Sequence, residues 1–133
     1  MRRLLPLAAL LLALAGCGGG KEAGPFPETV IGTVAQAPSG AAAGKKLFTS
    51  NGCGGCHTYK PAGSAGKVGP DLDNLAADAK KANKGSLEDY ARESIETPDA
   101  YVVPEYPKGV MPAFKGTLTD SQIDDLVSFL TKS

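Results

Sequence analysis

Two of the three cysteines and the single histidine of this 133-residue chain stand together at residues 53–57, in the order Cys-Gly-Gly-Cys-His. C-x-x-C-H is the attachment pattern of c-type haem, in which two thiols react with the two vinyl groups and the histidine binds the iron. A large apolar cofactor would also supply the core that a small domain often lacks. The pattern therefore predicts Cys53 and Cys56 as covalent haem attachments and His57 as an axial iron ligand.

Three other kinds of site also use two thiols with this spacing. A thioredoxin-like redox dithiol follows a β-strand, whereas residues 41–48 before this motif carry a helical pattern. A structural zinc site needs four ligands, and the motif supplies three. A disulfide between Cys53 and Cys56 closes a very small loop and therefore stabilises little. The motif favours haem attachment, with these three sites as alternatives.

The chain also contains a candidate for the second axial ligand of a haem iron. Apart from Met1, its one methionine is Met111, which stands 54 residues after His57 in a segment with glycine and proline. Haem with His and Met ligands is a common electron-transfer design, and Met raises the reduction potential. A lone Met can instead fill a gap in a core, but a loop setting favours a ligand. We therefore predict Met111 as the second axial ligand, with Val110 and Phe114 beside it to shield the iron.

Residues 1–16 are predicted to be a secretory signal peptide that is removed. Arg2 and Arg3 form a basic start, and an apolar run of mainly Leu and Ala follows. At about 18 Å as a helix, this run is too short to span a bilayer, and its basic flank fits a signal sequence. The run ends in Leu-Ala-Gly-Cys, which resembles the bacterial lipoprotein box, so Cys17 is expected to be lipidated. The alternative is an ordinary signal, with Cys17 as a free thiol.

Residues 17–40, which begin with the lipidated Cys, are predicted to be a flexible tether, because they are rich in Gly, Pro and Ala. The folded domain is expected over residues 41–133. Over the whole chain, 14 Lys and Arg balance 14 Asp and Glu, so the formal net charge is 0. This balance argues against a nucleic-acid binder that works through a basic surface.

Helical spacing and capping signals predict three to four short helices and no convincing strand pair in this domain, which is therefore all-α. We expect a helix through residues 41–48, a short helix near residue 71, a helix stopped by Pro98 and a last helix containing residues 123–130. Residues 86–89 and 119–122 carry the S-x-x-D and T-x-x-Q capping-box patterns that start the last two.

Taken in order, five segments of the domain resemble a class I monohaem cytochrome c. They are residues 44–48, 52–57, 68–72, 110–112 and 126–130. The resemblance implies the class I cytochrome c fold, in which three to four short helices and long loops wrap around one covalently bound haem c. It also implies that the carbonyl of Pro70 accepts a hydrogen bond from Nδ1 of His57 and orients the imidazole.

Two details of the resemblance concern a helix crossing and the segment before Met111. Gly44 and Phe48 match the positions at which the family's first helix crosses its last. Residues 93–98 and 106–112 are similar to the cytochrome c domain fused to subunit II of some haem-copper oxidases. Because no copper site or transmembrane pair precedes them here, we expect a free-standing relative of that domain.

The resemblance implies a membrane-tethered, extracytoplasmic electron carrier of a respiratory chain, which passes single electrons through its haem and is not an enzyme. A quinol–cytochrome c reductase or similar donor and a haem-copper oxidase or similar acceptor are the implied redox partners. The protein is expected to be a monomer, held by the lipid at Cys17 on the outer face of a bacterial cell membrane or in the periplasm. The alternative is a haem-based small-gas sensor or a peroxidase-like enzyme from which Met111 is displaced, although the chain has no second His for acid–base chemistry.

Two assignments stay open in the sequence. Six lysines near the motifs could form a docking ring for an acidic partner or could be ordinary solvated side chains. They are Lys45, Lys46, Lys60, Lys67, Lys108 and Lys115. The chain has no Trp to contact a haem propionate, so Tyr101 or Tyr106 is a candidate for that contact.

Overall fold

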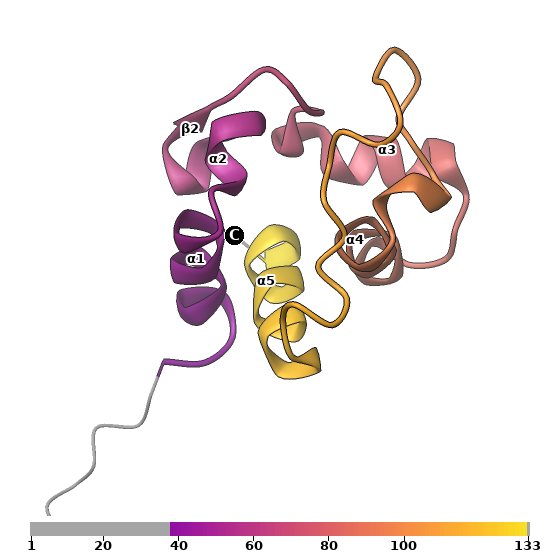
Figure 1. The fold of residues 1–133 in the computed structure, drawn as a ribbon. Coiled ribbons are helices and arrows are strands. Elements are labelled where there is room, and N and C mark those ends of the chain that lie inside the picture. The colour runs from indigo at the N-terminus through magenta and orange to yellow at the C-terminus, as the bar shows by residue number, and fades with distance from the viewer. Residues whose placement is uncertain (1–37, 133) are drawn as a thin grey trace, which may run out of the picture. The chain divides into compact units, whose positions relative to one another are not determined.

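The computed structural model describes residues 38–132, and these residues confirm the all-α class. The α-helices are α1 (Ala41–Ser50), α2 (Cys53–Cys56), α3 (Leu75–Ala82), α4 (Leu87–Glu96) and α5 (Asp120–Lys132) (Figure 1). The shorter elements are three 3₁₀-helices, η1 (Lys60–Ala62), η2 (Leu72–Asn74) and η3 (Pro98–Ala100), and two strands, β1 (Thr58–Tyr59) and β2 (Ser64–Ala65). No helix within this described range is long and apolar enough to cross a membrane. The predicted signal peptide, Cys17 and most of the predicted tether lie outside the described residues.

The helix count and the strand pair differ from the sequence prediction. Residues 38–132 contain five α-helices rather than three to four, because the thiol motif itself forms one helical turn, α2. Residues 58–65, expected to be loop, form an antiparallel pair in which Thr58 lies opposite Ala65 and Tyr59 opposite Ser64. Gly63 makes the turn between them with a φ of 69°, which glycine adopts without strain. With two residues in each strand, this pair leaves the fold class unchanged.

Helices α1 and α5 lie side by side (Figure 1). They cross at Gly44, which has no side chain to separate them. A Cβ atom at Gly44 would lie 2.0 Å from the backbone oxygen of Asp125 and 2.6 Å from Cβ of Phe129. One turn later, the ring of Phe48 packs edge-on against Phe129, with their centroids 5.8 Å apart. The crossing predicted at Gly44 and Phe48 is therefore confirmed, and it brings the two ends of the domain together.

The apolar face predicted for the last helix supplies much of the core. Ile123, Leu126 and Val127 are buried, and Leu130 packs against the edge of the same cluster. The hydroxyl of Tyr59 donates a hydrogen bond to the backbone oxygen of Phe129 at 3.0 Å. This bond ties the segment directly after the thiol motif to the end of α5.

Both predicted capping boxes are present. At the start of α4, the backbone N–H of Asp89 donates to Oγ of Ser86, and the N–H of Ser86 donates to the Asp89 carboxylate. Hydrogen bonds from Ser86 also lower the pKa of the Asp89 carboxyl group below its ordinary value. At the start of α5, Thr119 and Gln122 exchange the corresponding bonds at 2.9 and 3.3 Å. These local signals place α4 and α5 where the sequence predicts them.

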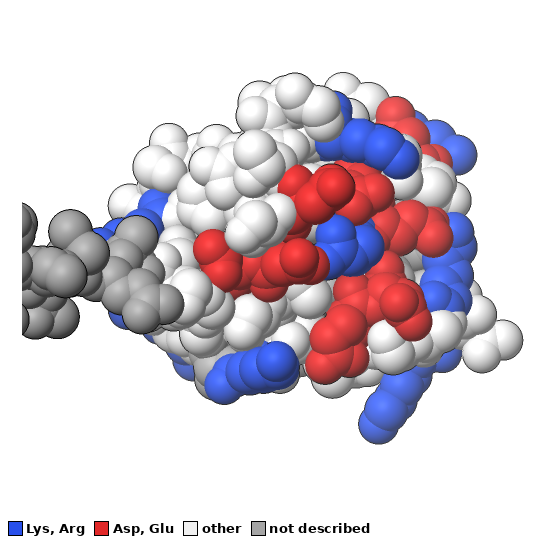
Figure 2. Space-filling model, turned by 90° about the horizontal axis from the view of Figure 1, so that it is seen from below, with Lys and Arg blue, Asp and Glu red and all other residues white. Residues whose placement is uncertain are grey.

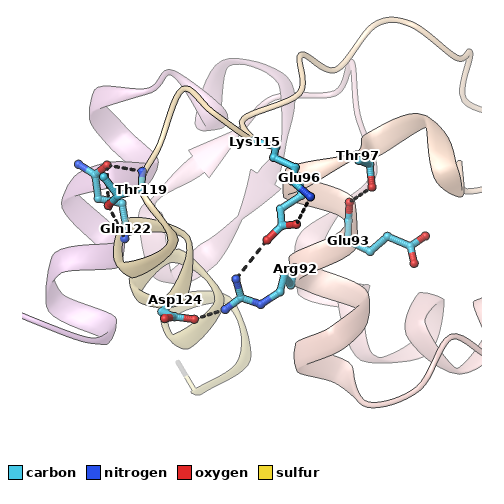
Figure 3. A network of polar contacts seen from close by, with 8 residues as sticks. All are labelled: Arg92, Glu93, Glu96, Thr97, Lys115, Thr119, Gln122 and Asp124. Atoms are coloured by element: carbon cyan, nitrogen blue, oxygen red, sulfur yellow. Dashed lines mark hydrogen bonds and ion pairs between the residues drawn. The ribbon is translucent and has the colours of Figure 1, made fainter.

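An ion-pair network ties the end of α4 to α5 and to the segment that precedes α5 (Figure 3). The guanidinium of Arg92 contacts Glu96 at 3.2 Å and also pairs with Asp124 of α5. The Nζ atom of Lys115 lies 3.8 Å from the Glu96 carboxylate. Acidic side chains gather on the face drawn in Figure 2, so the surface charge is uneven although the formal net charge is 0.

Candidate functional site

A cavity of about 250 Å³ lies between α2, α3, α4 and the segment that joins η3 to α5. The residues that sequence analysis assigned to a haem site line it together: Cys53, Cys56, His57, Pro70 and Met111. They come from three segments that are distant in sequence, so only the folded chain brings them to one place. The lipidation site predicted at Cys17 lies outside the described residues.

The two cysteines are held by the single turn of α2. Gly52 precedes this turn with a φ of 72°, in the left-handed region that ends α1 and lets the chain change direction. Both thiols are free; Cys53 is half-buried and Cys56 is exposed. Burial raises the pKa of the Cys53 thiol, so this group is held in its protonated form. The pair therefore lines the cavity as two unoxidised thiols, as haem attachment requires.

His57 is buried at the end of the motif, with 8% of its surface exposed. Its Nδ1 atom lies 2.7 Å from the carbonyl oxygen of Pro70. Because a carbonyl oxygen can only accept, Nδ1 carries a proton and donates it to Pro70, so this bond engages Nδ1 and not Nε2. The hydrogen bond expected between Pro70 and His57 is thus present, and it leaves Nε2 as the nitrogen available to a metal.

Gly69 lets the chain pass close to the imidazole. A Cβ atom at Gly69 would lie 2.6 Å from Cε1 and 2.9 Å from Nδ1 of His57. The N–H groups of Val68 and Gly69 both donate to the backbone oxygen of Cys56, at 3.0 and 2.9 Å. Residues 68 and 69 therefore pack directly against the imidazole ring of His57. This close contact leaves no room for a side chain at residue 69.

Met111 reaches the cavity from a segment without regular structure that is anchored on both sides. Before it, the N–H of Gly109 donates to the carboxylate of Asp99 at 2.8 Å. After it, the N–H of Phe114 donates to the backbone oxygen of Ile95 in α4 at 3.0 Å. The side chain of Met111 is half-buried in the cavity wall. Although Met111 lies in a loop, its position is set by α4 and η3.

The polar groups in the wall formed by α3 and α4 were not predicted from the sequence. Asp78, Tyr90 and Ser94 line the cavity there, and Asp78 has 9% of its surface exposed. The burial of Asp78 could have been inferred from its spacing to Leu75. Asp78 follows Leu75 by one helical turn and so lies on the same, buried face of α3. Tyr101 and Tyr106, the two candidates for a propionate contact, both line the cavity as well.

The alternatives for the thiol pair gain no support from the described residues. The element before the motif is helix α1, not the strand that a thioredoxin-like dithiol follows. In residues 38–132, no three His, Cys, Asp or Glu side chains gather as they would around a zinc ion. Cys53 and Cys56 are not joined by a disulfide.

The sequence pattern and this cavity agree with a comparison against known protein families. The model of the cytochrome c family, described as "Cytochrome c", matches residues 41–133. The chain belongs to the cytochrome c family.

Several relatives carry the name cytochrome c6. The protein from Picosynechococcus sp. is 33% identical over 130 residues, which cover 98% of this chain and 92% of the relative. The protein from Leptolyngbya boryana is 34% identical over 90 residues, or 68% of this chain and 88% of the relative. The protein from Gloeothece citriformis is 36% identical over 87 residues, or 65% of this chain and 66% of the relative.

Family membership confirms three of the sequence predictions. The fold is that of a class I cytochrome c, the cofactor is one covalently bound haem c, and the protein transfers electrons and is not an enzyme. The cavity fits this cofactor, because its walls are mainly apolar and it combines two free thiols with an imidazole whose Nε2 atom is left for the iron. As a cytochrome c domain, the chain exchanges electrons with redox partners.

Proposed function

We propose that this cytochrome c carries single electrons between membrane complexes outside the cytoplasm. Haem c supplies an iron that alternates between the ferric and ferrous states. The observation that carries the proposal is the meeting of Cys53, Cys56, His57 and Met111 on one cavity, although His57 and Met111 are 54 residues apart in sequence.

Each of these residues has a distinct role in the proposal. The thiols of Cys53 and Cys56 would hold the haem through thioether bonds to its two vinyl groups. Nε2 of His57 would bind the iron, and the Pro70 carbonyl orients the imidazole through the 2.7 Å hydrogen bond to Nδ1. The thioether of Met111 would be the second iron ligand, which raises the reduction potential. An iron held by both residues would exchange electrons with partners and would bind no substrate.

The rim of the cavity provides an apolar surface for the redox partner. Val68 and Val110 are the large hydrophobic side chains most exposed in the described part of the chain, at 54% and 50%, and both line the cavity. Val68 follows His57 in sequence and Val110 directly precedes Met111, so the two valines belong to different segments of the cavity wall.

The six lysines considered as a docking ring are all exposed, and two of them, Lys60 and Lys115, pair with acidic side chains of this domain. The apolar rim is therefore the contact we propose, with the remaining lysines available to steer a partner.

The location that we propose follows from the leader and the tether. Residues 1–16 direct export, Cys17 takes the lipid, and residues 17–40 let the monomeric domain move about the anchor, with an average reach of roughly 25 Å for a flexible coil. Several lipid chains anchor a protein far better than one does. The domain then works at the outer face of a bacterial cell membrane or in the periplasm. A quinol-oxidising complex donates its electron, and a haem-copper oxidase or similar complex accepts it.

Covalent attachment of haem at the two cysteines gives the first test. The pyridine haemochrome spectrum of the exported protein is expected to be that of haem with two thioether bonds, and haem should stay with the chain in denaturing electrophoresis. The double variant Cys53→Ala, Cys56→Ala should lose chain-bound haem entirely. An exported wild-type protein without covalent haem would contradict the proposal.

Lipidation of Cys17 has a separate test. We expect the full-length wild-type protein to sediment with membranes, and its mature N-terminal peptide to carry the mass of a lipid-modified cysteine. Cys17→Ser should release a haem-containing protein into the soluble fraction, because the residues that hold haem are unchanged. Equal membrane association of the wild type and Cys17→Ser would exclude the lipid anchor while leaving the electron-transfer site in place.

A further inference from the structure

We propose that the carboxylate of Asp78 lowers the reduction potential of the haem bound in this cavity. The inference rests on the proposed haem site and adds a residue that the attachment motif and the axial ligands do not include. Asp78 and His57 are the two buried polar or charged residues of the described chain, with 9% and 8% of their surfaces exposed. The buried position of Asp78 is unusual, because acidic side chains are rarely buried even when they have a partner.

Asp78 lies in the wall of the cavity that faces α2. Its helix, α3, turns the apolar residues Leu75 and Ala79 toward the same buried side. Helices α2 and α3 lie apart in Figure 1, and both contribute residues to the cavity wall. If Cys53 and Cys56 hold the vinyl groups, the macrocycle would occupy the cavity whose wall contains Asp78.

The charge of Asp78 is compensated only at the surface. Its partner is the Nζ atom of Lys81, 3.6 Å away, and the side chain of Lys81 is 71% exposed whereas that of Asp78 is 12% exposed. The cation therefore compensates the anion in part, from the solvent side, while the anion faces a largely apolar cavity. The charge of Asp78 also acts on Tyr90, another residue of the cavity wall. Burial raises the pKa of the Tyr90 hydroxyl, and the negative charge of Asp78 raises it further.

The sign of the effect on the haem follows from the charge of the iron. Oxidation adds one positive charge to the haem, so a nearby negative charge favours the ferric state and lowers the reduction potential. The interaction is stronger in the cavity than at the surface, because the effective dielectric constant is lower away from water. Burial and charge around the macrocycle are among the means by which a protein sets a haem potential.

The test is a redox titration of the holoprotein and its variants at neutral pH and fixed ionic strength. Asp78→Asn keeps the size of the side chain and removes the charge, and the midpoint potential should rise by up to about 59 mV, which is a tenfold change in the equilibrium constant of a one-electron couple. Asp78→Glu keeps the charge and should remain near the wild-type potential. Asp124→Asn is the matched control, because it makes the same charge change on a side chain that is 63% exposed and outside the cavity wall.

Lys81→Gln gives a second, independent result with the opposite sign. Removing the cation leaves Asp78 uncompensated, so the potential should fall, and it should not fall in the Asp78→Asn background. The proposal is overturned if Asp78→Asn shifts the potential no more than Asp124→Asn, or if Asp78→Glu behaves like Asp78→Asn. If Asp78→Asn does not fold, the single variant Lys81→Gln still tests the proposal. An unchanged potential in Lys81→Gln would then contradict it. The haemochrome spectrum of each sample shows whether haem is bound, which separates a failure of this inference from a failure of the proposed haem site.

Discussion

Replacing Met111 with alanine is expected to lower the reduction potential by roughly a few tenths of a volt, within the range of about 0.8 V that axial ligands set. A thioether ligand raises the potential of haem iron, and the alanine cannot replace it. The far-red absorption band of the oxidised protein, which depends on the sulfur–iron bond, should disappear in the same variant. The reduced variant should also bind carbon monoxide readily, because one axial position is open. Redox titration and absorption spectra of one preparation measure all three effects.

Val110→Ala is the control for this variant. Val110 precedes the methionine in the same segment and is 50% exposed, so its truncation leaves the anchors of that segment in place. The far-red band should persist in Val110→Ala, and the potential should move far less than in Met111→Ala. A wild-type protein without the band would contradict Met111 as a ligand, and so would a Met111→Ala variant that keeps it.

Gly44→Ala is expected to cost about 3 kcal/mol or more of folding stability, at the upper end of what overpacking a core costs. The new methyl group would lie 2.0 Å from the backbone oxygen of Asp125 and 2.6 Å from Cβ of Phe129, so α1 and α5 would have to move apart. Neither neighbour is the end of a flexible side chain that could swing away. Denaturant unfolding of the holoprotein, followed by circular dichroism, measures the loss.

Gly55→Ala is the matched control for Gly44→Ala. It makes the same substitution in a helical glycine, but nothing lies within 4 Å of the added Cβ atom. Its stability should stay within about 0.5 kcal/mol of the wild type, as for most substitutions in open positions. If the two variants unfold at the same denaturant concentration, the close crossing of α1 and α5 does not limit stability.

The parts of the fold that were predicted correctly depend on short-range signals. The capping boxes at Ser86 and Thr119 act over three residues, and the apolar face of α5 repeats at helical spacing, so both can be recognised in the sequence. The pair of β1 and β2 was missed because two-residue strands have no periodicity to detect. The helical turn at the thiol motif was not among the expected helices, since two adjacent glycines favour loop over helix.

Some residues of the candidate site could likewise be recognised in the sequence, and others could not. The thiol motif and the lone methionine are unusual enough in this chain to be recognised from the order of residues alone. Asp78 was missed because one acidic residue on a helix rich in lysine and alanine looks like a solvated side chain. The spacing of one helical turn after Leu75 was the one local signal, and burial itself results from packing between α3 and α4. The anchoring of the Met111 segment by Asp99 and Ile95 is likewise a long-range result of the fold.

The crossing at Gly44 also determines when the domain can fold. Helix α1 is the first helix of the domain, and it packs against α5, the last. Domains generally fold as units, and contacts between distant parts of a chain form late. Until the final residues of the domain are available, α1 has no partner to pack against. In the exported precursor proposed above, the crossing could therefore form only after the last helix has emerged, and both thiols of the motif would stay accessible to haem until then.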